Sequence, residues 1–140
     1  MLRMQTTRYR QGNKFNAKKV KGFTSDKIYD SMAERNRAEY LKDMETKGEI
    51  EDLREQPKVQ LSKYHTYKPD FCYLENGRRV FEDHKGAETE RFRINVKLWR
   101  ERGPGVLRIT KRRGKYGKFF AKDIHPDQYD ESLWSDRAAP

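Results

Sequence analysis

Residues 67–86 read Tyr-Lys-Pro-Asp-Phe-Cys-Tyr-Leu-Glu-Asn-Gly-Arg-Arg-Val-Phe-Glu-Asp-His-Lys-Gly, and this stretch decides the fold. Two runs rich in β-forming residues, Tyr67–Leu74 and Arg79–Lys85, flank a turn at Glu75–Arg78. The Asn-Gly pair in that turn is the strongest short-range signal for a β-hairpin, because both residues tolerate positive φ. We therefore predict two adjacent antiparallel strands.

The polar residues of this hairpin are unusual for a simple sheet. Asp70 lies in the middle of the first predicted strand, and Asp83 and Lys85 lie at the end of the second. Residues two apart share a face of a strand, so Asp83 and Lys85 point one way and Glu82 and His84 the other. Two carboxylates and an ammonium on neighbouring strands suit a metal-dependent hydrolytic site. An exposed, salt-bridged hairpin explains the same residues, and the stretch alone does not choose between the two.

Composition limits the class of protein. The chain has 140 residues, of which 34% are hydrophobic and 39% charged, which predicts one domain with a modest core. We expect a basic arm at 1–13, a core at 14–122 and an acidic C-terminal segment at 123–140. The formal net charge of +10 favours a polyanionic partner.

The positive charge is concentrated in two blocks. Residues 1–23 hold seven Lys or Arg and residues 102–122 hold eight, with no acid in either, whereas residues 123–140 hold five acids. A plain solvated surface more often mixes the two signs. The blocks therefore indicate a nucleic-acid footprint, with its best phosphate contacts at Lys14, Lys18, Lys19, Lys111, Arg112, Arg113 and Lys115.

A single cysteine and the lack of long apolar runs indicate the compartment. Cys72 has no partner for an intrachain disulfide, which fits a reducing cytoplasm, and its aromatic neighbours indicate core packing. No run approaches the roughly 20 apolar residues that span a bilayer. We expect a cytoplasmic protein with no membrane partner.

The elements before the central hairpin follow from local signals. A small hairpin is predicted from Lys14–Val20 and Phe23–Tyr29, with its turn at Lys21-Gly22. A helix is predicted from Ser31 to about Lys47, because Ser-Met-Ala-Glu fits a capping box and Gly48 suits the end. Its expected buried stripe consists of Ala33, Tyr40, Leu41 and Met44.

The remaining elements complete a mixed sheet. An acidic connector (Glu49–Glu55), a strand (Gln56–Leu61), a helix (Glu88–Arg102), a strand (Val106–Thr110) and a basic loop (Lys111–Lys118) are predicted. The second helix presents Phe92, Val96 and Trp99 on one face. The order predicts an α/β fold with a helix on each face of the sheet and the last strand reached by a crossover helix.

Glu34 has two interpretations. As the third residue of the capping box it satisfies a free backbone N–H at the start of the helix. It also lies four residues before Ala38 and seven before Leu41, at the edge of the core-facing stripe, from where a carboxylate could reach the hairpin. The residues alone leave both open.

Taken together, the ordered motifs resemble the PD-(D/E)xK nuclease superfamily, and within it a group of small bacteriophage-encoded nucleases related to Holliday junction resolvases. The matching segments are Asp30-Ser31-x-x-Glu34, Gly48-Glu-Ile-x-Asp-Leu-x-x-Gln56-Pro57, Pro69-Asp70-Phe71 and Glu82-Asp83-x-Lys85-Gly86. The resemblance implies a restriction-endonuclease-like core with catalytic residues Glu34, Asp70, Asp83 and Lys85.

Two neighbouring acids compete for the last motif position. Only Asp83 shares the face of Lys85, so we choose Asp83 over Glu82, which is kept as an auxiliary residue. His84 lies on the wrong face and is interpreted as structural. Gln56 either orients a ligand or water or is a plain strand-end glutamine.

The resemblance implies metal-assisted phosphodiester hydrolysis. Asp70, Asp83 and Glu34 would hold one or two Mg²⁺ ions, with Mn²⁺ as a substitute. Lys85 would orient or help deprotonate the attacking water, or neutralise charge on the phosphorane. No Ser, Cys or Tyr is placed for a covalent intermediate.

The implied substrate is branched DNA. A chain of this size has one active site, so paired cuts on a four-way junction require a two-fold symmetric homodimer. Tyr9, Phe15 and Tyr116 either stack on exposed bases or pack locally. The alternatives are another PD-(D/E)xK DNA endonuclease (nicking, restriction-like or transposase-type) and, in a different class, a non-catalytic nucleic-acid-binding protein.

Overall fold

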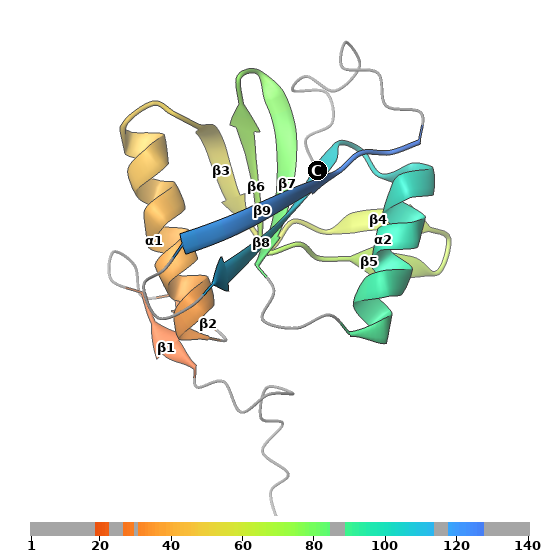
Figure 1. Cartoon of the computed structure of the whole chain (residues 1–140), viewed down its shortest axis with the longest axis horizontal. Helices are drawn as coiled ribbons and strands as arrows, with labels where there is room; N and C mark the ends of the chain where they lie inside the picture. The colour runs from red at the N-terminus through yellow and green to blue at the C-terminus, as the bar shows by residue number, and fades with distance from the viewer. Residues whose placement is uncertain (1–18, 23–26, 30, 85–88, 114–117, 128–140) are drawn as a thin grey trace, which may run out of the picture. The chain divides into compact units, whose positions relative to one another are not determined.

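Figure 1 presents a computed structural model that describes residues 19–22, 27–29, 31–84, 89–113 and 118–127, with only the backbone at 112, 113 and 118–120. The chain divides into two compact units, residues 1–39 and 40–140. Helix α1 (Met32–Thr46) crosses the boundary between them. None of the helices in the described ranges is long and apolar enough to cross a membrane.

The first unit contains a short antiparallel pair. Strand β1 (Val20–Lys21) pairs with β2 (Ile28–Tyr29), which confirms a hairpin here. The predicted turn at Lys21-Gly22 is wrong, because Lys21 pairs with Ile28 and the Gly22 N–H donates to the carbonyl of Lys27 at 2.9 Å. Pairing thus continues past the predicted turn. The rest of the two predicted runs, at 14–18 and 23–26, lies outside the described residues.

Both ends of α1 carry the predicted caps. The Ser31 Oγ accepts from the Glu34 N–H at 3.1 Å, which is the first half of a capping box. At the other end Gly48 has φ +76°, and the Glu49 and Gly48 N–H groups donate to the Met44 and Glu45 carbonyls, as in a Schellman motif. Residues 31–34 therefore define the start of the helix and residues 44–49 its end.

Only one residue of the predicted buried stripe of α1 is buried, since Ala33 and Met44 are half-buried. Leu41 is fully buried, but Tyr40 is 48% exposed. The buried positions are Glu34, Arg37, Ala38 and Leu41, a spacing of three and four residues that keeps them on one side of the helix. Tyr40 precedes Leu41 by about 100° of helical rotation and so leaves that side.

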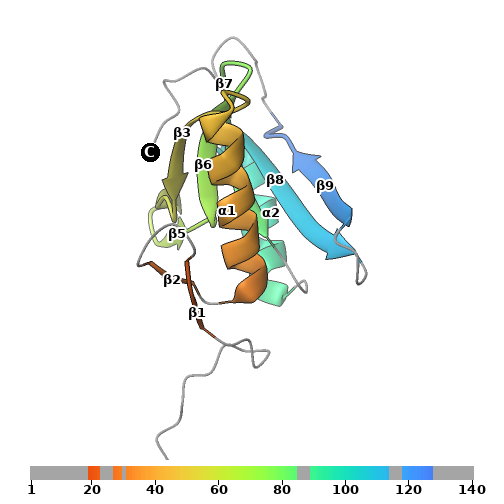
Figure 2. The same cartoon turned by 90° about the vertical axis from the view of Figure 1, so that its left-hand side faces the viewer.

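The second unit is built on a five-stranded mixed sheet. Its order is β3-β6-β7-β8-β9, and Figure 2 shows β9 and β3 at opposite edges. The pairs are antiparallel except β7 with β8, which are parallel and joined through α2 (Glu90–Arg102). This confirms a mixed α/β fold with a crossover helix. The strands are β3 (Glu51–Glu55), β6 (Phe71–Glu75), β7 (Arg78–His84), β8 (Val106–Arg113) and β9 (Lys118–Ile124).

The central hairpin is confirmed, with a later start. Asn76 and Gly77 have φ of 52° and 77°, as a two-residue type I′ turn requires, and they set the pair Glu75↔Arg78. The first strand begins at Phe71 and not at Tyr67, so Asp70 precedes the strand. Tyr67 instead ends β5 (His65–Tyr67), which pairs with β4 (Val59–Ser62) as a separate ribbon.

Two edge strands were not predicted. The expected acidic connector Glu49–Glu55 contains β3, and the expected basic loop Lys111–Lys118 contains the end of β8 and the start of β9. Edge strands face water and therefore tolerate charged residues. Because charged residues are depleted in average strands, the sequence did not indicate strands at these positions. The segments β3 and β9 are strands because their backbones pair with β6 and β8, respectively.

A hydrophobic core lies between α2, the β4–β5 ribbon and one face of the sheet. Trp99 of α2 is fully buried and meets the rings of Tyr67 and Phe81 edge-on, at 6.0 and 5.1 Å between centroids. The Trp99 Nε1–H donates to the carbonyl of Gly105 at 2.8 Å, so the only polar atom of the buried indole has a hydrogen-bond partner. Cys72 is fully buried in this core, as predicted.

We expect Gly77→Ala to lower the free energy of unfolding by about 1 kcal/mol, because a Cβ disfavours the left-handed conformation at φ +77°. The added methyl meets nothing within 4 Å, so the effect is conformational. Urea unfolding measures it. Asn76→Gly, which keeps a residue tolerant of positive φ, is the matched control. Equal stability of Gly77→Ala and wild type would contradict this account of the turn.

Candidate functional site

Asp70 connects the start of β6 to the end of β7. Its Oδ2 accepts from the backbone N–H of His84 at 2.8 Å, and its own carbonyl accepts from the Gln56 N–H at 2.8 Å. Pro69 precedes it and has no N–H to enter a ladder, which is consistent with β6 starting only at Phe71. The carboxylate is thus fixed beside the last residue of β7.

Asp83 lies beside Asp70 on the neighbouring strand. The β6–β7 register pairs Phe71 with Glu82, so the residue before Phe71 lies opposite Asp83. Asp83 is 2% exposed, and its Oδ2 accepts a hydrogen bond from the phenol of Tyr67. Two aspartates that are thirteen positions apart in the sequence therefore lie at the same end of the hairpin.

The Tyr67 phenol is held in its protonated form. Burial raises its pKa well above the ordinary value, and the negative charges of Asp83 and then Asp70 raise the pKa further. The phenol therefore remains a hydrogen-bond donor to Asp83. Tyr67 was not predicted as a site residue, and a tyrosine in a strand offers no sequence signal for this role.

Glu82 lies on the opposite face from Asp83, as strand periodicity predicted. It is fully buried, and its carboxylate accepts from the Tyr73 hydroxyl at 2.7 Å and from the Thr110 hydroxyl at 3.4 Å. Burial and then the Glu82 charge raise the pKa of the Tyr73 phenol, which keeps its proton. Glu82 thus belongs to a buried network.

His84 joins the same network as Glu82. Its Nδ1 lies 2.8 Å from the Thr110 Oγ1, so a strand neighbour on β8 holds the imidazole. This position agrees with the structural interpretation of His84. Thr110 was missed from the sequence, since only the β7–β8 register, which pairs it with His84, brings the two together.

Other predicted site residues are not brought to this pair of acids by the described structure. Lys85 lies outside the described residues. Glu34 is buried and sits in the first compact unit, where its N–H is capped by Ser31. Gln56 is exposed with φ +51° and contributes its backbone N–H to Asp70.

The predicted phosphate contacts are only partly described. Lys19 is exposed in the first unit, and Lys111 lies on β8 in the second. Arg112 and Arg113 belong to β8, of which only the backbone is described at these positions. Lys14, Lys18 and Lys115, and the aromatic residues Tyr9, Phe15 and Tyr116, lie outside the described residues.

The chemistry of the two acids fits a hard divalent cation. Within the described ranges, no group of three or more His, Cys, Asp or Glu side chains is arranged to hold a metal. Mg²⁺, however, keeps several waters and is commonly bound through one or two carboxylates and the phosphates of its substrate. Asp70 and Asp83 supply such a pair of carboxylates.

Comparisons with known proteins identify a family without a known activity. A family model described as "Protein of unknown function (DUF1064)" matches residues 12–118. A search of curated proteins gave no significant match. A search of solved structures gave none either.

We expect Tyr67→Phe to lower the free energy of unfolding by about 1–3 kcal/mol, because the buried Asp83 carboxylate loses a hydrogen-bond donor. Urea unfolding with circular dichroism measures the change. Tyr64→Phe removes a hydroxyl from a side chain that is 88% exposed and should leave stability unchanged. If both variants unfold like wild type, the phenol does not fix the acid.

Proposed function

The chain belongs to the DUF1064 family of proteins of unknown function, and from that premise we propose that it is a metal-dependent endodeoxyribonuclease of the PD-(D/E)xK type. One observation carries the proposal. Asp70, at the start of β6, and Asp83, near the end of β7, meet at the place where the sequence continues into Lys85. A pair of carboxylates can hold a metal ion that assists hydrolysis of a phosphodiester, and a lysine can stabilise the charge that develops on the phosphate.

The strand topology supports the same proposal. The sequence expectation was a helix, a strand, a hairpin, a crossover helix and a parallel strand. The hairpin β6–β7, the crossover helix α2 and the parallel strand β8 follow α1 in that order. The predicted strand Gln56–Leu61 instead contributes to β4 of a separate ribbon, and the unpredicted strand β3 pairs with β6. The β4–β5 ribbon is inserted between β3 and β6, and β9 extends the sheet beyond β8.

The chain's own residues would position a metal and a water. Asp70 and Asp83 would bind Mg²⁺, or Mn²⁺ in its place, and the resemblance of the motifs implies Glu34 as a third carboxylate. When bound, the ion would lower the pKa of its water and offset charge on the phosphate. Tyr67 and the His84 N–H each hold one carboxylate in a fixed orientation, which favours binding without reorganisation. Lys85 would orient the water or neutralise the phosphorane.

The substrate that we propose is branched DNA, in the first place a four-way junction. The support is the resemblance of the motifs to resolvase-like nucleases and the net charge of +10. Paired cuts with one active site in each chain require a homodimer with two-fold symmetry. Another PD-(D/E)xK endonuclease activity, and DNA binding without cleavage, are the alternatives that the experiments distinguish.

We expect Asp70→Asn and Asp83→Asn each to lower Mg²⁺-dependent DNA cleavage by more than about a hundredfold, because each removes a metal-binding charge. Binding to the same DNA in EDTA should stay near that of wild type. Gel assays of cleavage and binding measure both. Glu101→Gln, an exposed carboxylate on α2, is the charge-matched control. Cleavage by either aspartate variant at the wild-type rate would overturn the proposed site.

A comparison of substrates tests the proposed specificity. With Mg²⁺, we expect symmetric paired nicks on a four-way junction and little cutting of linear duplex, because a two-fold dimer matches a two-fold junction. Flap and nicked substrates complete the series. Equal cutting of linear duplex would refute junction resolution and favour another endonuclease. DNA binding with no cleavage of any substrate in Mg²⁺ or Mn²⁺ would refute the nuclease proposal as a whole.

A further inference from the structure

A pocket of about 340 Å³ opens between α2 and the β8–β9 hairpin in the second unit, within the size range of ligand sites. Among the residues that the structure describes, its lining combines apolar residues with cations and contains no acid. The apolar residues are Phe92, Val96, Ile109 and Ile124, and the basic residues are Arg93, Lys97, Arg100, Lys111 and Lys122.

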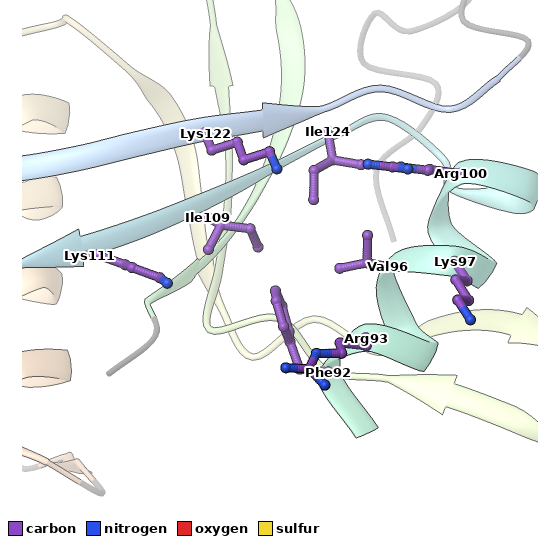
Figure 3. Close-up of a pocket in the computed structure, with 9 residues that line it drawn as sticks. All are labelled: Phe92, Arg93, Val96, Lys97, Arg100, Ile109, Lys111, Lys122 and Ile124. Carbon is purple, nitrogen blue, oxygen red and sulfur yellow. The ribbon is translucent and has the colours of Figure 1, made fainter. Parts of the chain in front are cut away.

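The floor of this pocket is formed by residues of the hydrophobic core. Phe92, Ile109 and Ile124 belong to the buried cluster around Trp99, and Val96 packs against it. Figure 3 shows the four apolar side chains converging from α2 on one side and from β8 and β9 on the other. A flat apolar group bound on this floor would therefore contact the hydrophobic core.

The rim of the pocket carries several positive charges. Arg93, Lys97 and Arg100 recur at steps of four and three residues on α2, and Lys122 is the register partner of Ile109. Within the described part of the chain, Arg93, Lys97, Arg100 and Lys122 have no ion-pair partner. Like charges around an apolar floor repel one another, and an anion bound there relieves the repulsion.

The pocket lies on the same face of the sheet as Asp83. Ile109, in its floor, is the register partner of Asp83 across the β7–β8 pair. Phe92 also lines a neighbouring pocket together with Tyr67, whose phenol donates to Asp83. A ligand in the cationic pocket would therefore continue toward the carboxylates without leaving this face of the sheet.

We propose that this pocket binds one unpaired nucleotide of a DNA strand, with the base on the apolar floor and its phosphates on the basic rim. The choice of DNA as the ligand rests on the proposed function. A paired duplex keeps its bases inside the stack and presents phosphates alone, which would leave the apolar floor unused. An unpaired nucleotide presents a flat π-face and an anion together. The pocket would then favour DNA in which a nucleotide unpairs at the branch.

Binding without metal tests the proposal separately from catalysis. In EDTA, fluorescence anisotropy compares an oligothymidylate of about twelve nucleotides with an abasic strand of the same length and charge. We expect wild type to bind the thymidylate about fivefold more tightly or better, since a stacked base contributes that much to affinity. Equal binding of the two strands overturns the proposal and leaves the cleavage experiments on Asp70 and Asp83 unaffected.

A matched pair of helix variants locates the base. Val96→Trp fills the pocket without changing charge, so the preference for thymidylate over the abasic strand should disappear while abasic binding remains. Ile94→Trp introduces the same indole at an exposed position of α2 outside the pocket and should keep the preference. A preference retained in Val96→Trp overturns the assignment.

A second pair tests the rim without touching the core. Lys122→Gln should reduce the slope of log affinity against log salt by about 0.7, the value for one phosphate contact on a single strand. Lys58→Gln, an exposed lysine outside the pocket, should leave the slope unchanged. Equal effects of the two variants would mean a general cationic surface and would overturn the rim assignment. Saturable binding of an acidic, aliphatic peptide with no preference between the two strands would assign the pocket to a protein partner instead.

Discussion

The register of the β6–β7 hairpin is the constraint on which the rest of the second unit depends. A two-residue turn at Asn76-Gly77 permits one pairing, Glu75↔Arg78, and every later pair is counted from it. At the far end this count brings Asp70 beside Asp83. A slip of one residue would turn Asp83 to the other face and put Glu82 in its place, because side chains alternate along a strand. The candidate site is therefore a consequence of the turn at the opposite end of the hairpin.

Burial of the consecutive acids Glu82 and Asp83 is offset by phenols on both faces of the sheet. Tyr73 donates to Glu82, and Tyr67 donates to Asp83. Removing a carboxylate from water is costly unless such donors replace the water. Tyr67 also packs edge-on against Trp99, so the orientation of Asp83 is tied to the centre of the core. The hydrophobic core and the candidate site thus share a side chain, and the acid is held rigidly.

The sequence predicted best what a few consecutive residues control. The caps of α1, the turn at Asn76-Gly77 and the opposite faces of Glu82 and Asp83 all follow from local backbone geometry. Prediction from the sequence failed for β3 and β9, because these charged segments become strands only through pairing with strands that are distant in the sequence or unrecognised. The start of β6 was placed too early because Tyr67 belongs to a ribbon with β4. The site was anticipated as a pair of aspartates, Asp70 and Asp83, but not with the hydroxyl that supports it.

By itself the sequence determined the turn, the thirteen-residue spacing of Asp70 and Asp83 and the two blocks of positive charge. Periodicity also indicated which residues share a face of an element, such as Phe92, Val96 and Trp99 on α2. Tertiary structure alone decided which faces meet: Tyr67 with Asp83, Thr110 with His84, and the cations of α2 with those of the last two strands around one pocket. The reason is physical. Local sequence sets backbone conformation within an element, whereas contacts between elements depend on strand register and core packing, which involve residues far apart in the chain.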